Sequence, residues 1–241
     1  MTMLTIIIPT YNAAAVVGGT LKSLTSRQQP TEVSRETPAE IPGEISAKII
    51  VADGGSTDET RQIVTAAGAT LAMAPKGRGQ QLAAGARAAG TGWLLFLHAD
   101  TRLADHWPDA VTSFAADPAN ARRAGYFRFA LDDAAPAARR LEKAVFWRNR
   151  LLGLPYGDQG LLISREFYQA LGGYRPIPLM EDVDLAVRIG RHRLVMLDSR
   201  AVTSAEKYRR EGYLRRSLRN AVCLSLYVVG IPPRVIARLY G

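Results

Sequence analysis

The sequence has little cysteine, few acidic residues and no apolar run long enough to cross a bilayer, and each shortage excludes a class of protein. Cys223 is the single cysteine in 241 residues, which excludes an internal disulfide framework and a cysteine-based structural zinc site. The N-terminus lacks the basic segment and cleavage site of a signal peptide, so no cleaved leader is expected. The apolar core of the C-terminal tail, residues 221–231, is too short for a membrane span. No Gly-x-Gly-x-x-Gly follows Ile8, which argues against a dinucleotide-binding Rossmann domain.

Acidic residues number 22 against 31 lysines and arginines, which gives a net charge of +9 and a pI near 10.0. Such an excess predicts anionic partners, of which nucleic acid, an anionic membrane surface and phosphorylated small molecules are the candidates. A solvated basic face is the alternative reading of the arginine clusters near the C-terminus. The length fits one large domain, or one domain with an appendage.

Short apolar runs alternate with helical patterns through the first hundred residues. Strands are predicted over residues 5–9, 48–53, 70–74 and 93–97, and helices over 13–26, 56–67 and 80–89. Ser56 and Glu59 have the spacing of a capping box for the second helix. Residues 27–47 are polar and contain prolines, which predicts a mobile surface loop. This alternation predicts an α/β fold with a doubly wound, mainly parallel mixed sheet.

The regular alternation of predicted strands and helices ends after Asp100. Helices are predicted over residues 107–116, 135–152 and 180–189, and strands over 125–131, 161–164 and 193–197. An amphipathic helical tail follows over residues 213–240, and it would pack against the body, a partner subunit or a membrane surface.

Four candidate site residues lie at or just after the ends of three predicted strands. They are Pro9 and Tyr11 at the first strand, Asp53 at the second, and Asp100 after the strand over residues 93–97. The carboxyl ends of parallel strands meet at one edge of an open sheet, which is where such sheets bind ligands. Taken alone, Asp53 could be only a turn residue and Asp100 only a helix cap. Their convergence with Pro9 and Tyr11 predicts a ligand site on this rim.

Four ordered motifs resemble glycosyltransferase family 2. They are Ile-Ile-Pro9-Thr-Tyr-Asn12, Asp53-Gly-Gly-Ser-Thr-Asp58, the strand that leads to Asp100, and Gly172-Gly-Tyr followed by Glu181-Asp182-Val-Asp-Leu. The resemblance covers roughly residues 4–197 and implies a nucleotide-sugar-binding, Rossmann-like GT-A fold. Gly77-Arg-Gly-Gln-Gln, Leu97-His-Ala-Asp-Thr and Tyr156-Gly-Asp-Gln-Gly resemble a small bacterial subgroup of this family.

The resemblance implies a domain plan. Residues 1–200 would form the catalytic domain, with a nucleotide-binding half over 1–103 and an acceptor-binding half over 104–200. Residues 201–241 would form a basic amphipathic tail of helices. The location implied is cytoplasmic, with a peripheral contact to the inner face of the membrane or a homodimer through the tail as alternatives.

By the same resemblance, the donor end of the site would take a UDP-sugar. Pro9 and Tyr11 would wall the base, Asp53 would accept a hydrogen bond from it, and Arg78 would lie over the base or the diphosphate. Asp100 matches the last aspartate of the DXD motif, which holds a divalent metal, Mn²⁺ or Mg²⁺, on the diphosphate. His98 stands where the first aspartate would be, which predicts weaker or differently selective metal binding. A histidine satisfied by the backbone is the alternative for His98.

The acceptor end is implied in the same way. Asp182 matches the general base, with Glu181 beside it, and displacement by one base implies inversion at the sugar. The QXXRW signature of processive synthases is absent after Asp182, which favours transfer of a single sugar. Asp158 and Gln159 are candidates for the acceptor or sugar pocket. Arg209 and Arg210 are candidates for closing over the diphosphate. The acceptor itself, a sugar, a lipid or a small molecule, is left open.

Two functions from other classes compete with this interpretation. A nucleotidyltransferase would carry a glycine-rich basic signature after the first strand, where this chain has Pro-Thr-Tyr-Asn. A nucleic-acid-binding protein would suit the net charge of +9, but no recognised nucleic-acid motif occurs and the acidic rim would repel phosphates. No nucleic-acid partner is therefore expected.

Overall fold

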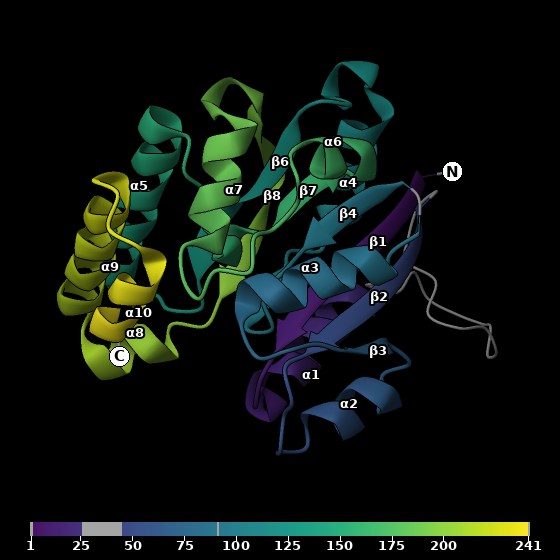
Figure 1. Cartoon of the computed structure of the whole chain (residues 1–241), viewed down its shortest axis with the longest axis horizontal. Coiled ribbons are helices and arrows are strands. Elements are labelled where there is room, and N and C mark those ends of the chain that lie inside the picture. Colours follow the sequence, from purple (N-terminus) through teal and green to yellow (C-terminus); the bar gives the residue numbers. More distant parts are fainter. Residues whose placement is uncertain (1, 26–44, 91, 241) are drawn as a thin grey trace.

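Four parallel strands form the first half of the sheet, in the order β3-β2-β1-β4 (Figure 1). They are β1 (Thr2–Thr10), β2 (Ile45–Asp53), β3 (Thr70–Met73) and β4 (Trp93–Phe96). The computed structural model describes residues 2–25, 45–90 and 92–240. β1 carries an apolar run over residues 6–9 because both faces of this strand are covered, and seven consecutive residues from Leu4 to Thr10 are buried.

The second half of the sheet is mixed. It contains β5 (Thr101–Leu103), β6 (Ala124–Leu131), β7 (Leu161–Ser164) and β8 (Leu194–Thr203), and the complete order is β3-β2-β1-β4-β7-β6-β8-β5. β7 runs antiparallel to both β4 and β6, and β5 runs antiparallel to β8. The remaining strands share one direction, so the predicted mixed, mainly parallel α/β sheet is confirmed.

Helices cover both faces of the sheet. Alternate residues of β1 point to opposite faces, so Ile6 and Ile8 pack with α1 (Ala14–Thr25), α2 (Thr60–Ala66) and α4 (Trp107–Ala116). Ile7 packs on the other face with α3 (Arg78–Ala88), α6 (Arg165–Ala170) and α7 (Glu181–Ile189). Full burial of each isoleucine contributes roughly 1.5–3 kcal/mol, so the two cores fix β1 at the centre of the fold.

The C-terminal helices pack at the end of the molecule that carries α7 (Figure 1). They are α8 (Glu206–Glu211), α9 (Tyr213–Val228) and α10 (Pro233–Tyr240), and α5 (Pro136–Leu152) lies beside α9. Cys223 and Ile236 are buried against Met180 and Val183 at the start of α7. The tail is therefore docked on the body of the protein. Within the described residues, no helix combines the length and apolar character that crossing a membrane requires.

The remaining elements are three short 3₁₀ helices: η1 (Pro118–Asn120), η2 (Gly157–Gln159) and η3 (Arg191–Arg193). η2 directly precedes β7, so its residues lie at the edge of the sheet where the cleft described below opens.

Asp100 occupies a turn and not the end of a strand, which corrects the expectation from the sequence. β4 ends at Phe96, and the amide of Thr101 then donates to the carbonyl of His98 at 3.2 Å. The chain reverses into β5, an element that the sequence pattern did not predict because three residues carry no readable period. The turn presents His98 and Asp100 toward the edge of the sheet where β1 ends.

Three other boundaries differ from those predicted. α2 begins at Thr60, because the Ser56 hydroxyl donates to Asp53 and accepts from the amide of Asn12 instead of capping the helix. Residues 27–44 of the predicted mobile loop lie outside the described residues, and residues 45–47 belong to β2. β8 continues to Thr203, so the expected domain boundary after residue 200 falls inside a strand of the sheet.

Candidate functional site

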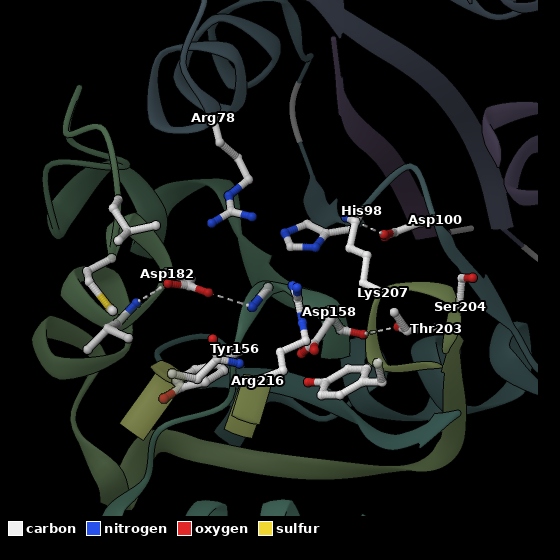
Figure 2. Close-up of a pocket in the computed structure, with 16 residues that line it drawn as sticks. Arg78, His98, Asp100, Tyr156, Asp158, Asp182, Thr203, Ser204, Lys207 and Arg216 are labelled. Atoms are coloured by element: carbon white, nitrogen blue, oxygen red, sulfur yellow. Dashed lines mark hydrogen bonds and ion pairs between the residues drawn. The ribbon is translucent and has the colours of Figure 1, made fainter. Parts of the chain in front are cut away.

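Two adjoining cavities open where β1 and β4 end. The β1 cavity, of about 410 Å³, is lined by residues at the end of β1 and just after it, including Pro9 and Tyr11. The Asp182 cavity, of about 130 Å³, is lined by η2, the start of α7 and the tail helices (Figure 2). The residues that line both cavities are Arg78, His98, Asp100, Ser204 and Lys207. Because these residues are shared, the two cavities form one cleft.

The β1 end of the cleft has an aromatic wall. Tyr11 is 43% exposed, and the ammonium group of Lys76 lies 4.0 Å from the centroid of its ring. Gln81 fixes the backbone behind this wall, since its amide donates to the carbonyls of Thr10 and, at 3.1 Å, of Ala52. Sequence reasoning missed Gln81, because a glutamine in a helix carries no signal that it is buried.

Asp53 holds the turn after β2 and does not line the cleft. Its carboxylate has no exposed surface and accepts from the amides of Gly55 and Ser56, from the Arg61 guanidinium and from the Thr10 hydroxyl. Burial alone would raise the pKa of Asp53, but hydrogen bonds from Ser56, Arg61 and Thr10 lower it below its usual value. The predicted contact with a base stays a prediction, and the packing gives this carboxylate a positioning role.

His98 lies in the middle of the cleft. Burial, together with the nearby charge of Arg78, lowers the pKa of His98 to about 4, so the imidazole is neutral near pH 7. The backbone of Gly157 packs directly on this ring, because a Cβ atom at residue 157 would clash with His98 Nε2. A glycine at this position therefore brings η2 against the turn after β4.

Asp100 faces the cleft beside a lysine. Lys207 Nζ lies 3.3 Å from Asp100 Oδ2, and the Asp100 side chain is 22% exposed. Burial opposes ionisation of this carboxyl, but His98 and Lys207 outweigh it and lower the pKa of Asp100. Among the described residues, no three histidine, cysteine, aspartate or glutamate side chains are grouped to hold a metal ion. A metal here would depend on Asp100 and on oxygen atoms of a bound ligand, and it would replace the Lys207 contact.

Asp182 lies in the first turn of α7, where the helix dipole favours a negative charge. One carboxylate oxygen accepts from the amide of Gly157 at 2.9 Å and the other from the amide of Val183 at 2.8 Å (Figure 2). These two bonds orient the carboxylate at the wall of the cavity. Glu181 has no exposed surface and pairs with Arg78, and burial raises its pKa although Arg78 opposes the shift. Glu181 therefore positions Arg78 from behind the cleft.

Asp158 also lines the Asp182 cavity, as predicted from the loop. Burial raises its pKa to about 6, against the opposing charge of Arg148 and with reinforcement from Asp182 and Asp100. Its Oδ1 atom is buried without a hydrogen-bond partner among the described residues. An uncompensated carboxylate here favours a proton or a donor group of a bound ligand.

Replacing Asp158 by asparagine is expected to stabilise the protein increasingly as the pH rises from about 4 to about 7. In the unfolded chain Asp158 loses its proton near 3.8, whereas in the folded protein it does so only near 6. The wild type therefore loses stability over this interval, and the uncharged asparagine does not. The measurement is the difference in melting temperature between the two proteins at several pH values, with Asp109→Asn on the exposed start of α4 as the control. A difference that is constant with pH would contradict the raised pKa.

Gln159 does not line either cavity, which corrects the expectation for this residue. Its side chain has no exposed surface. Its Oε1 atom accepts from Arg148 at 3.1 Å, from Asn149 at 3.0 Å and from the amide of Tyr156, and its Nε2 atom donates to the carbonyl of Phe127 at 3.1 Å. Because every polar atom of this amide is used inside the protein, Gln159 fastens η2 to α5 and β6.

Replacing Gln159 by leucine is expected to lower the free energy of unfolding by about 2–3 kcal/mol, because buried donors and an acceptor lose their partner. Urea denaturation measures this change. Gln62→Leu is the matched control, since Gln62 is exposed on α2 and should change stability little. Equal stability of the two variants would show that water replaces the lost bonds.

Arg209 and Arg210 do not reach the cleft, which also corrects the expectation. Arg209 pairs with Asp132 and Asp133 at 3.7 and 3.8 Å, and Arg210 pairs with Glu211 at 3.6 Å. The cations that line the cleft from the tail are Lys207 and Arg216 instead. Arg209 is two positions after Lys207 and so lies on another side of α8, whereas Arg210 is three positions after it and pairs with Glu211 instead. A cluster of basic residues in the sequence does not reveal which of them faces the cleft.

The cleft therefore joins positive charge to an oriented carboxylate. Arg78, Lys207 and Arg216 line it and can bind an anionic group, while Asp182 can accept a proton beside them. Tyr11 and Pro9 offer flat surfaces at the other end. This combination suits a ligand with a ring system, a phosphate-like group and a reacting hydroxyl.

Comparisons with known proteins agree on the fold. The model of the family described as Glycosyl transferase family 2 matches residues 5–140, more than half of the chain. No curated protein matches the sequence. S. aureus TarS in complex with UDP-GlcNAc has a TM-score of 0.61 at 15% identity over 84% of this chain and 58% of that chain.

Two further solved structures are similar. The mannosyltransferase PcManGT from Pyrobaculum calidifontis, in complex with GDP-Man and Mn²⁺, has a TM-score of 0.62 at 19% identity over 91% of this chain and 60% of that chain. Glucosyl-3-phosphoglycerate synthase from Mycobacterium tuberculosis, in complex with Mn²⁺, UDP and glucosyl-3-phosphoglycerate, has a TM-score of 0.55 at 18% identity over 84% and 70%. At these identities the likeness shows the fold alone, and this chain spans 58% of the TarS chain.

Proposed function

The chain belongs to glycosyl transferase family 2, and on that premise we propose that it moves one sugar from a nucleotide-diphosphate sugar, most simply a UDP-sugar, to an acceptor hydroxyl. The observation that carries this proposal is the continuity of the cleft. Arg78, His98 and Asp100 line both cavities, so a ligand can run from Tyr11 to Asp182 without leaving the cleft. The similar structures that hold UDP-GlcNAc and GDP-Man support this class of donor.

The donor would lie in the β1 cavity. Its volume of about 410 Å³ is within the range that small-molecule sites usually have. The exposed ring of Tyr11 would stack with the base, beside Pro9. Arg78, held by Glu181, would bind the diphosphate together with Lys207. Asp53 would act indirectly, by holding the turn after β2 against β1.

The acceptor would lie in the Asp182 cavity. Asp182 would take the proton of the attacking hydroxyl as general base, and its bonds to Gly157 and Val183 keep its carboxylate oriented for that role. A positioned base contributes roughly 10²–10⁴ in rate. Attack on the face opposite the leaving diphosphate implies inversion at the sugar.

A divalent metal, Mn²⁺ or Mg²⁺, would join the donor at Asp100. The residues fit a metal that is held jointly with the donor, because Asp100 offers one ionised carboxylate and the described residues offer no complete ligand set. When bound, such a metal neutralises the negative charge that develops on the leaving diphosphate. His98, neutral in this cleft, would stand where the DXD motif has its first aspartate.

Calorimetry with UDP, with and without Mn²⁺, tests the proposal. We expect one UDP site per chain and tighter binding with the metal, because the metal and the diphosphate complete each other's ligands. A screen of UDP-glucose, UDP-GlcNAc and GDP-mannose by thermal unfolding would then identify the donor, since a ligand at 100 times its Kd adds about 2.7 kcal/mol of stability. An absence of nucleotide binding at millimolar concentration would overturn the assignment.

A further inference from the structure

A mostly apolar cavity, the α5–α9 groove, adjoins the acceptor end of the cleft. It has a volume of about 300 Å³ and lies between α5 and α9. Phe129, Leu141, Val145 and Leu224 supply its apolar lining, and Ala144 and Ala221 line it at exposed positions of the two helices. No role in the sequence prediction accounts for a cavity at this place.

The groove and the Asp182 cavity share a wall. Tyr156, Asp158, Tyr208 and Asn220 line both of them. Part of this wall is fixed, because the Arg148 guanidinium lies 3.5 Å from the centroid of the Tyr156 ring and donates to the carbonyl of Leu154 at 3.0 Å. These shared residues place the apolar space directly beside the cavity that Asp182 lines.

Two exposed apolar side chains lie one helical turn from positions that line the groove. Trp147 follows Ala144 by three residues on α5 and is 54% exposed, and Leu218 precedes Ala221 by three residues on α9 and is 61% exposed. Exposed Arg140, Lys143 and Arg150 lie on the same helix as Trp147. Clustered apolar side chains at a surface mark a contact site, and basic residues among them are typical of surfaces that meet amphiphiles.

We propose that the acceptor is an amphiphile: a hydroxyl compound whose apolar group lies in the α5–α9 groove while its hydroxyl reaches Asp182. The inference rests on the proposed function, because it names the acceptor class of the same cleft. A wholly polar acceptor would leave the groove in contact with water. An alkyl chain buries it, and each buried methylene strengthens binding about fourfold.

The test uses 11-(dansylamino)undecanoic acid as a fluorescent alkyl probe of the full chain. Wild-type protein should bind it at one saturable site. Tryptophan at the exposed positions, in Ala144→Trp and Ala221→Trp, fills the groove without disturbing the core and should weaken binding by about tenfold or more, because the chain loses several buried methylenes. Ala66→Trp, on the exposed end of α2, is the control and should bind as the wild type does.

Competition between the probe and two glucosides tests whether the groove binds an alkyl chain. Octyl β-glucoside below its micelle concentration should displace the probe, whereas methyl β-glucoside, with the same hydroxyls and no chain, should not. Equal probe binding by the groove-filling variants, or equal competition by the two glucosides, would overturn the proposal. UDP calorimetry on the same variants separates a failure of the proposed function from a failure of the proposed acceptor class. The affinity of the variants for UDP should equal that of the wild type. A wild type that binds no UDP would overturn the proposed function and leave the groove result standing.

A second arm distinguishes a membrane lipid from a free amphiphile as the source of the chain. Sedimentation of the wild type, and not of Ala144→Trp, with phosphatidylglycerol vesicles would assign the acceptor to an anionic bilayer, because a contact made through the net charge of +9 alone would be common to both proteins. Protein that stays in the supernatant while it binds octyl glucoside would assign it to a dispersed amphiphile. Both results support an apolar group in the groove, and failure to bind either preparation would contradict it.

Discussion

Replacing Asp182 by asparagine is expected to lower the rate of sugar transfer by about 10²–10⁴. The amide cannot take the proton of the attacking hydroxyl, so the reaction loses its base. The loss should fall on kcat, because the affinity for UDP depends on the other end of the cleft. The measurement is the release of UDP from the donor that the thermal screen identifies, with calorimetry of UDP on the same protein.

The control for this variant must separate chemistry from structure. Both oxygens of Asp182 accept backbone bonds, from Gly157 and Val183, and asparagine can keep only one of them. Asp109→Asn makes the same exchange in the first turn of α4, at an exposed position outside the cleft, and should leave the rate unchanged. If Asp182→Asn also loses UDP binding, the carboxylate holds η2 in place and its role is structural.

Replacing Asp100 by alanine is expected to remove the effect of Mn²⁺ on UDP binding and to lower transfer by about 10²–10³, the size of effect seen when one group that stabilises developing charge is lost. The variant removes the only carboxylate that faces both cavities among the described residues. UDP binding without metal should persist, because Arg78 and Lys207 remain. Calorimetry with and without Mn²⁺ measures both parts.

Lys207→Ala is the matched comparison, because it removes the other half of the same ion pair. It should weaken metal-free UDP binding by removing a cation from the cleft, while the effect of Mn²⁺ persists because Asp100 is then unpaired. A Mn²⁺ effect on UDP binding that is lost in Asp100→Ala and kept in Lys207→Ala would support a metal at Asp100. A Mn²⁺ effect that survives in Asp100→Ala would mean that the metal binds elsewhere.

Sequence patterns predicted the strands that are buried along their whole length and the helix with a regular apolar face. β1 and β7 are buried on both faces and read as apolar runs, and α4 has the predicted bounds. β5 is too short to show a period, and the solvent-exposed polar residues of β8 hide its last six positions. Local sequence therefore predicts strands that are buried on both faces well, and very short strands or strands with exposed polar positions poorly.

The candidate site divides in the same way. Tyr11 and Asp100 could be placed on the rim because each follows a recognisable strand, whereas Asp182 was named from the resemblance to a family motif. Lys207 could not, since its place in the cleft depends on how α8 docks and on the rotation of that helix. Gln159 looked available because it lies between glycines, yet four internal hydrogen bonds engage both its Oε1 and its Nε2 atoms.

The contact between Lys207 and Asp100 joins positions 107 residues apart in the chain, and it has a consequence for engineering. A truncated protein that stops at residue 200 would cut β8, expose the partner residues Phe129 and Ala130 of β6, and remove one wall of the cleft. A chimera that exchanges the tail would lose the same wall, because Lys207, Arg216 and Asn220 of the tail line the cleft. The tail and the lining of the cleft therefore cannot be varied independently in this chain.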